Sequence, residues 1–236
     1  MTTERLRSAD RRAERGTRIL DVTADLLLRH GARRVTIDDV AAGAGIGKGT
    51  VYLHWKTREQ LFGAAFQREV LAALGELRNE LRKDPQVSRL HRFARAYFLA
   101  ITDRPLLRGF LLADADLLGK LAGSSDAALD ERHGKLSHRY FELLAEHGLV
   151  RDDLALDELG YAYQATFEGF LRAEGLAGHS LQQQADLLAR TIERAFESGQ
   201  TPAETELREL ADAVAELLTD LIDADSAEAG IPSPPA

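Results

Sequence analysis

A glycine-rich segment with a lysine and a threonine, GAGIGKGTVYLHWK, occupies residues 43–56 and has the composition of a phosphate-binding site. Nucleotide-binding loops hold phosphate oxygens with backbone N–H groups beside glycines and with a lysine. The phosphate-loop pattern requires serine or threonine directly after Gly-Lys, but Lys48 is followed by Gly49. The pattern Gly-x-Gly-x-x-Gly also fails, because Lys48 and Thr50 stand where its third glycine would be. The segment therefore does not match a nucleotide-binding enzyme.

The same segment fits two short helices joined by a glycine turn. Gly45 separates predicted helices at residues 36–44 and 48–54, at a point where a left-handed backbone costs glycine little. Thr36 is predicted to cap the first helix. A second helix of this kind inserts into the major groove of DNA and holds phosphates with its flanks. Hydrogen-bond donors lie along its expected exposed side: Lys48, Thr50, Tyr52, His54 and Lys56.

The rest of the chain has helical periodicity, and no segment alternates convincingly as a strand does. Ile19, Val22, Leu26 and Leu27 form one apolar stripe on a first helix. Glycine and proline clusters separate the later segments. The predicted helices cover roughly residues 11–30, 36–44, 48–54, 57–82, 87–102, 105–120, 127–147, 156–174, 180–198 and 203–223. The fold class predicted is all-α.

Charge is distributed unevenly along the 236 residues. Residues 1–60 hold 12 lysines and arginines against 8 acidic residues, whereas residues 61–236 carry a net charge of −12. A basic N-terminal quarter on an acidic body is expected where one small part meets a polyanion. The chain has no cysteine, which excludes a disulfide framework or a thiolate metal site. No apolar run has the ~20 residues that span a bilayer, and we expect no membrane contact and a cytoplasmic protein.

Residues 17–66 resemble the DNA-binding domain of tetracycline-repressor-type transcriptional regulators. The likeness rests on Gly31, Thr36-Ile37, Val40-Ala41 and Gly45-Ile46, on the run Lys48-Gly49-Thr50-Val51-Tyr52, on Trp55 and on Arg58-Glu59-x-Leu61. It implies a helix-turn-helix domain with a basic N-terminal arm at residues 1–62 and a helical ligand-binding and dimerisation domain at 63–223. The tail at 224–236 lacks periodicity, and we expect it to be disordered.

The resemblance also assigns roles to residues of the helix-turn-helix. Lys48, Tyr52 and Lys56 would contact the DNA backbone, together with Thr36 at the start of the preceding helix. Gly49, Thr50 and His54 would face the bases. Thr50 offers a methyl group to thymine or a hydroxyl to a base edge. Double-stranded DNA with a palindromic operator is therefore the expected partner, because a two-fold dimer reads two half-sites.

Two of the later helices carry apolar stripes on which a second copy could pack. In the resembling family two such helices from each protomer form a four-helix bundle, although the stripes could also pack within one subunit. The expected interface residues are Leu159, Tyr163, Phe167, Phe170, Leu188, Ile192 and Phe196.

The middle helices are rich in aromatic residues, and in the resembling family this region encloses a ligand pocket. Aromatic residues at helical spacing are, however, more often core than pocket. The expected lining is Phe66, Phe93, Tyr97, Ile101, Phe110, Tyr140, Leu144, Tyr163 and Phe167. Few charges interrupt it, so the effector, a small molecule of unknown identity, is expected to be apolar or amphipathic.

The function expected from these features is a homodimeric repressor released from its operator by such a ligand. One alternative is an activating or ligand-independent regulator with the same DNA-binding fold. A distant alternative is a helical enzyme that uses the central cavity. No catalytic set, metal site or cofactor is expected, because the histidines and acids lack a suitable spacing.

Overall fold

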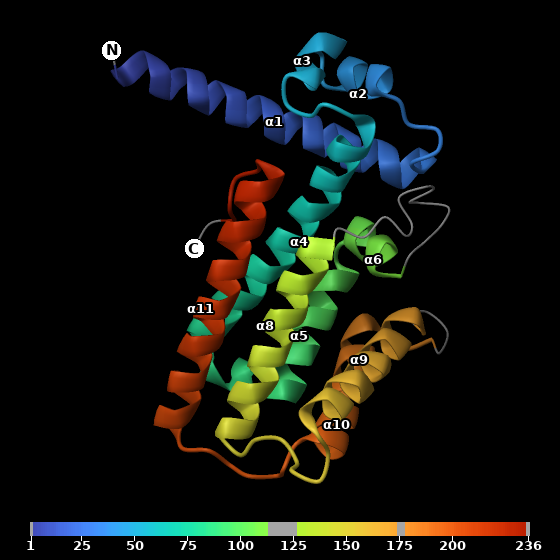
Figure 1. The fold of residues 1–236 in the computed structure, drawn as a ribbon. Coiled ribbons are helices and arrows are strands. Elements are labelled where there is room, and N and C mark those ends of the chain that lie inside the picture. Colours follow the sequence, from blue (N-terminus) through green and yellow to red (C-terminus); the bar gives the residue numbers. More distant parts are fainter. Residues whose placement is uncertain (1, 113–126, 174–177, 235–236) are drawn as a thin grey trace. The chain divides into compact units, whose positions relative to one another are not determined.

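The computed structural model describes residues 2–112, 127–173 and 178–234, and most of them are helical (Figure 1). Within these ranges the only β pairing is an isolated antiparallel bridge between Val150 and Glu197, so the all-α prediction is confirmed. The helices are α1 (Thr2–His30), α2 (Ile37–Gly43), α3 (Lys48–Tyr52), α4 (Arg58–Lys83), the 3-10 turn η1 (Pro85–Ser88), α5 (Leu90–Thr102), α6 (Pro105–Leu111), α8 (Ala127–Glu146), α9 (Leu156–Arg172), α10 (Leu181–Phe196) and α11 (Glu204–Ala229).

The described residues group into two compact units. The first contains residues 2–71, 105–112 and 224–234, and the second contains residues 72–104, 127–173 and 178–223. Helices α4 and α11 each contribute residues to both units. The domain boundaries at residues 62 and 223 stay a prediction.

The first unit is built on α1, which packs against α2, while α2 packs against α3. Ile19 and Leu27 of the predicted stripe are fully buried, and Val22 and Leu26 are half-buried. Helix α1 begins at Thr2, well before the predicted start at residue 11, because its charged first turns carry no apolar periodicity to reveal them.

The C-terminal residues also differ from the prediction. Helix α11 continues to Ala229, so residues 224–229, which we expected to be disordered, are helical. Within the first unit Asp225 is buried, and its carboxylate accepts a hydrogen bond from Gln67 Nε2 at 3.0 Å. Ile231 is buried as well. These contacts hold a segment that has no helical pattern of its own.

In the second unit α5 packs against α10, α9 and η1, while α8 packs against α9. The predicted helix ends are close to the observed ones for α8, α9 and α10. The predicted helix at 87–102 is divided by Arg89, which has an extended backbone and separates η1 from α5. The first part of the predicted helix at 105–120 is observed as α6, which ends at Leu111. Residues 113–120 of that prediction lie outside the described residues.

Candidate nucleic-acid interface

Helix α2 starts on a reciprocal pair of hydrogen bonds between Thr36 and Asp39. The Thr36 hydroxyl accepts from the Asp39 backbone N–H at 3.2 Å, and the Asp39 carboxylate accepts from the Thr36 backbone N–H at 2.9 Å. This capping box satisfies two N–H groups that a helix start would leave unpaired. The hydrogen bonds from Thr36 also hold the pKa of Asp39 below its ordinary value. Thr36 is thus the predicted cap, and its side chain remains exposed.

Glycines set the angle between α2 and α3. Gly45 has φ = +65°, the left-handed conformation predicted for the turn. Gly43, at the end of α2, lies so close to α1 that an added Cβ would be 2.6 Å from Cγ1 of Val22. Gly47 caps α3 without a side-chain hydrogen bond. The turn therefore depends on two glycines: Gly43 allows the backbone to approach α1 closely, and Gly45 adopts the left-handed conformation.

Helix α3 has a polar face that is accessible to solvent and an apolar face that is buried. Val51 and Trp55 are buried on the inner side. On the outer side Tyr52 is 39% exposed, Thr50 is half-buried, and Gly49 has open space where a side chain would be. The outer face of α3 is therefore accessible to solvent, and at Gly49 no side chain protrudes from it, as suits an element that enters a groove.

A second anchor holds the start of α4 to the loop before α2. The Arg58 guanidinium donates hydrogen bonds to the carbonyl oxygens of Ala32 and Val35, each at 3.2 Å, and its cation lies 5.3 Å from the centre of the Phe62 ring. These contacts fix α4 against the helix-turn-helix, so the outer face of α3 has one orientation within the unit.

Basic groups flank α3: Lys48 is its first residue, and Lys56 lies in the loop that follows it. The Lys48 ammonium lies 2.8 Å from the Asp38 carboxylate, and this hydrogen bond raises the pKa of Lys48. Lys56 is exposed, and its side chain has no hydrogen bond or ion pair among the described residues. Since the Lys48 pair is exposed, it contributes little to stability.

His54 does not face outward with Tyr52 and is half-buried. Its ring stacks on Trp55 with centroids 5.3 Å apart, and a Cβ added at Gly16 would be 3.5 Å from its Nδ1. Burial and the charges of Arg12 and Arg15 lower the pKa of His54. The expectation that His54 faces the bases is therefore not supported by its position, because α1 covers the ring.

The expected ligand-pocket residues fall into separate units. Phe66 and Phe110 stack with centroids 5.3 Å apart in the first unit. The other seven lie in the second unit. There the ring centroids of Phe93 and Tyr140 are 4.6 Å apart, and those of Tyr97 and Phe167 are 5.6 Å apart. The Tyr140 hydroxyl donates to the Ser88 carbonyl at 2.8 Å. Burial raises the pKa of Tyr97 to about 12 and raises that of Tyr163 as well.

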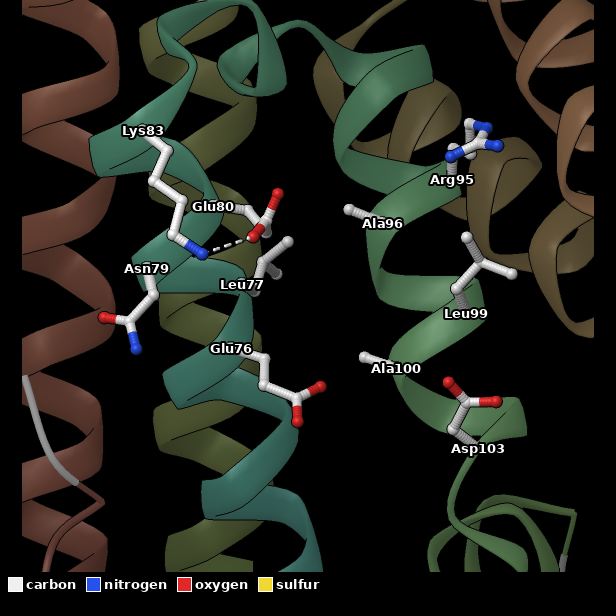
Figure 2. A pocket seen from close by; sticks show the side chains of 10 residues that line it. All are labelled: Glu76, Leu77, Asn79, Glu80, Lys83, Arg95, Ala96, Leu99, Ala100 and Asp103. Atoms are coloured by element: carbon white, nitrogen blue, oxygen red, sulfur yellow. Dashed lines mark hydrogen bonds and ion pairs between the residues drawn. The ribbon is translucent and has the colours of Figure 1, made fainter. Parts of the chain in front are cut away.

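A pocket of about 340 Å³ lies elsewhere in the second unit, between α4 and α5. Figure 2 shows Ala96 and Ala100 of α5 turned toward α4, which carries Leu77 and the ion pair of Glu80 with Lys83 at 3.0 Å. The aromatic pattern did not identify this pocket. Small residues four apart on α5 were the available signal, because they leave room between two helices.

Most of the expected dimer-interface residues are buried inside the protomer. Leu159, Phe167, Leu188, Ile192 and Phe196 are inaccessible or nearly so, and a second copy cannot reach them. That part of the expectation is wrong, because α9 and α10 turn these stripes toward the core of their own unit. Tyr163 and Phe170 are half-buried.

A buried ion network joins the start of α5 to the end of α10. Glu197 has a side chain that is 2% exposed, and its carboxylate accepts from Arg89 Nη2 at 2.6 Å and lies 2.7 Å from His91 Nδ1. With Glu193 these groups include one imidazole and two carboxylates within metal-binding range. Arg89 and His91 already occupy both oxygens of Glu197, so the cluster is accounted for as an ion network.

No helix within the described ranges is long and apolar enough to span a membrane. Residues 19–65 match the family model of bacterial regulatory proteins of the tetR family. A Mycobacterium bovis protein, described as an uncharacterized HTH-type transcriptional regulator, is 43% identical over 72 residues, which cover 28% of this chain and 36% of that protein. The match thus spans about a third of the length of these relatives.

Solved structures share the fold over most of the chain. The complex of SmeT with triclosan covers 80% of this chain and 96% of its own, with a TM-score of 0.60 and 19% identity. SmeT is the repressor of the Stenotrophomonas maltophilia multidrug efflux pump SmeDEF. KstR2 of Mycobacterium tuberculosis, a ketosteroid transcriptional regulator, covers 78% of this chain and 95% of its own, with a TM-score of 0.55 and 21% identity. Residues 19–65 are thus similar in sequence to the tetR family of bacterial regulatory proteins, and most of the chain shares its fold with solved structures of such regulators.

Proposed function

We propose that the protein is a homodimeric transcriptional repressor that binds palindromic operator DNA through α3. The observation that carries this proposal is the outer face of α3, where Thr50 and Tyr52 are accessible between Lys48 and Lys56. Two cations at the ends of a short helix suit phosphates on either side of a major groove. Thr50 is the side chain assigned to base contact, and Gly49 lets the helix approach the base edges.

The proposal places dimerisation on the outward faces of α9 and α10. Tyr161 is 78% exposed, and on the same face of α9 the small residues Ala165 and Gly169 are exposed as well. Leu187 of α10 is 36% exposed, one turn before the exposed Thr191. Large apolar side chains beside small ones are suited to close helix packing, and a two-fold dimer doubles the number of base pairs that are read.

The effector is proposed to be a small apolar or amphipathic molecule that binds the second unit. The aromatic cluster of α5, α8 and α9 offers apolar surface and includes the half-buried Tyr97 and Tyr163. A complex with triclosan is known for SmeT, whose fold is similar. The effector must bind the released state more tightly, since equal affinity for both states shifts nothing, and operator DNA must then weaken effector binding by the same factor.

To test the proposal, the full chain first selects DNA from a random pool, and the affinity of its variants for the selected duplex is then measured. Lys56→Ala is expected to weaken binding to all sequences alike and to flatten the dependence of log K on log salt by about one unit per protomer. Thr50→Ala is expected to change the preferred base at one symmetric pair of positions, at a cost of roughly 1–3 kcal/mol. Lys135→Ala, which removes an exposed lysine of α8 paired with Glu131, is the matched control.

An unchanged salt slope for Lys56→Ala would remove Lys56 from the DNA contacts. If Thr50→Ala lowers affinity equally for every sequence, Thr50 positions the helix and does not read bases. Failure of the wild-type chain to enrich any sequence would contradict the proposed function itself.

A further inference from the structure

Two exposed arginines of α1 carry charges that no contact among the described residues explains. Arg15 and Arg18 form no hydrogen bond or ion pair with any of the residues that the structure describes, and both side chains are exposed. They are three residues apart, so they project from one face of α1 in adjacent turns. Two unpaired cations on one helix face attract a polyanion.

The direction of this face follows from Val22. Val22 follows Arg18 by four residues and Arg15 by seven, so all three lie on one face of α1. The Val22 side chain contacts the end of α2, since its Cγ1 is 2.6 Å from the Cβ position of Gly43. The arginine face therefore continues, toward the N-terminus of α1, the surface on which the helix-turn-helix packs.

Contacts at the end of α3 place the same region of α1 beside the recognition helix. Arg12 Nη2 donates a hydrogen bond to the Leu53 carbonyl oxygen at 3.2 Å, and the Gly16 backbone lies against the His54 ring. The positive charges of Arg12 and Arg15 act on His54 and lower its pKa. The Arg12 cation also lies at the negative end of a short helix, where a cation is stabilising.

We propose that Arg12, Arg15 and Arg18 form a second phosphate-binding row, which extends the DNA contact beyond the segment that α3 covers. Helix α3 has five residues and is about 7.5 Å long, whereas the row from Arg12 to Arg18 adds about 9 Å on the neighbouring helix. A guanidinium binds phosphate oxygens in a bidentate way, and Arg12 keeps N–H groups in addition to the one that Leu53 accepts. This inference rests on the proposed function and concerns phosphates, not bases.

The test compares two duplexes that carry the same selected site. One ends at the site, and the other has one further helical turn, about 10 base pairs, on each side. The wild-type chain is expected to bind the longer duplex more tightly and with a steeper salt dependence. In the double variant Arg15→Gln/Arg18→Gln this advantage is expected to shrink, because only Arg12 of the row remains, and the slope on the longer duplex should fall by about 0.9 units for each arginine lost from each bound protomer.

Two variants control for charge and folding. Arg92→Gln/Arg208→Gln removes two exposed arginines of the second unit and is expected to leave both slopes unchanged. Arg15→Lys/Arg18→Lys keeps the charge and is expected to retain most of the slope. The base preference of Arg15→Gln/Arg18→Gln is expected to match that of the wild type, because the row contacts only phosphates.

Equal slopes for wild type and Arg15→Gln/Arg18→Gln on the longer duplex would overturn the inference, and the arginines would be a solvated helix face. That result would leave the proposed function intact, provided that the wild type still prefers its selected site. A wild-type chain that binds neither duplex in a salt-dependent way would instead contradict the proposed function.

Discussion

The Cγ1 atom of Val22 in α1 lies 2.6 Å from the position that a Cβ atom on Gly43 of α2 would occupy. Val22 is β-branched and has few alternative rotamers in a helix, so it cannot move aside cheaply. The close approach brings the end of α2 onto α1 just before the turn that leads to α3. The position of α3 within the first unit therefore depends on the absence of a side chain at Gly43.

Gly43→Ala is expected to destabilise the protein by about 1–3 kcal/mol, because the added methyl group must displace Val22 or separate the two helices. Urea unfolding of the full chain measures this change. In the Val22→Ala background, Gly43→Ala should cost less stability than it does in the wild type, since the smaller side chain at position 22 leaves room for the added methyl group. If Gly43→Ala raises stability, as alanine does at an unconstrained helix position, the helices are farther apart than described.

Gly49→Ala separates a role in DNA contact from a role in folding. A Cβ at Gly49 or at Gly63 meets nothing within 4 Å. Gly63→Ala, inside α4, is expected to stabilise the protein by about 0.5–1 kcal/mol and to leave DNA affinity unchanged. Gly49→Ala should not lower stability but should weaken DNA binding, because its methyl group lies on the face proposed to enter the groove. Equal DNA affinities for both variants would exclude close approach of DNA at Gly49.

Glu197 makes the free energy of unfolding depend on pH in the acidic range. Burial by itself raises the pKa of Glu197, but the hydrogen bonds from His91 and the charges of His91 and Arg89 outweigh burial and lower it. A lowered pKa in the folded state means that the carboxylate stabilises the fold above its unfolded pKa. This stability is lost as pH falls through the folded pKa.

Glu197→Gln is therefore expected to make the loss of stability below about pH 4.5 shallower. At neutral pH the same change should cost about 3–5 kcal/mol, because it leaves Arg89 beside a neutral group in a buried site. Free energies of unfolding between about pH 3 and about pH 7 test both points. Glu193→Gln, three residues from the end of α10 and exposed, should change the profile little. Identical profiles for Glu197→Gln and wild type would contradict the ion network.

Tyr161→Glu and Phe167→Glu distinguish the outer face of α9 from its inner face. Phe167 is buried against Tyr97 and Tyr163, so a carboxylate there should unfold or strongly destabilise the protomer. Tyr161→Glu should leave the helical circular dichroism intact but yield monomers in analytical ultracentrifugation. A stable Tyr161→Glu dimer would place the interface away from the exposed face of α9.

Features that depend on a few neighbouring residues were predictable from the sequence. The Thr36 cap, the left-handed Gly45 and the buried Ile19 and Leu27 all follow from residue types and spacing within one helix or turn. The two helices of the helix-turn-helix were placed within a few residues for the same reason.

Features that depend on how helices meet were not predictable. Both faces of α9 and α10 carry large apolar side chains, so periodicity could not decide which face points inward. His54 is covered by a turn of α1 that lies 38 residues away in sequence around Gly16, and no local pattern encodes that contact. The pocket between α4 and α5 likewise arises from the spacing of two helices around Ala96 and Ala100.

Selection of DNA from a random pool by the full chain, followed by titration of the enriched duplex, measures directly whether α3 recognises a DNA sequence. We expect enrichment of a two-fold symmetric sequence, bound at least about 10³-fold more tightly than unrelated DNA of equal length. We also expect the logarithm of the affinity to fall linearly with the logarithm of the salt concentration. Enrichment of no sequence, or equal affinity for the selected and the unrelated duplex, would contradict the assignment of α3 as a recognition helix.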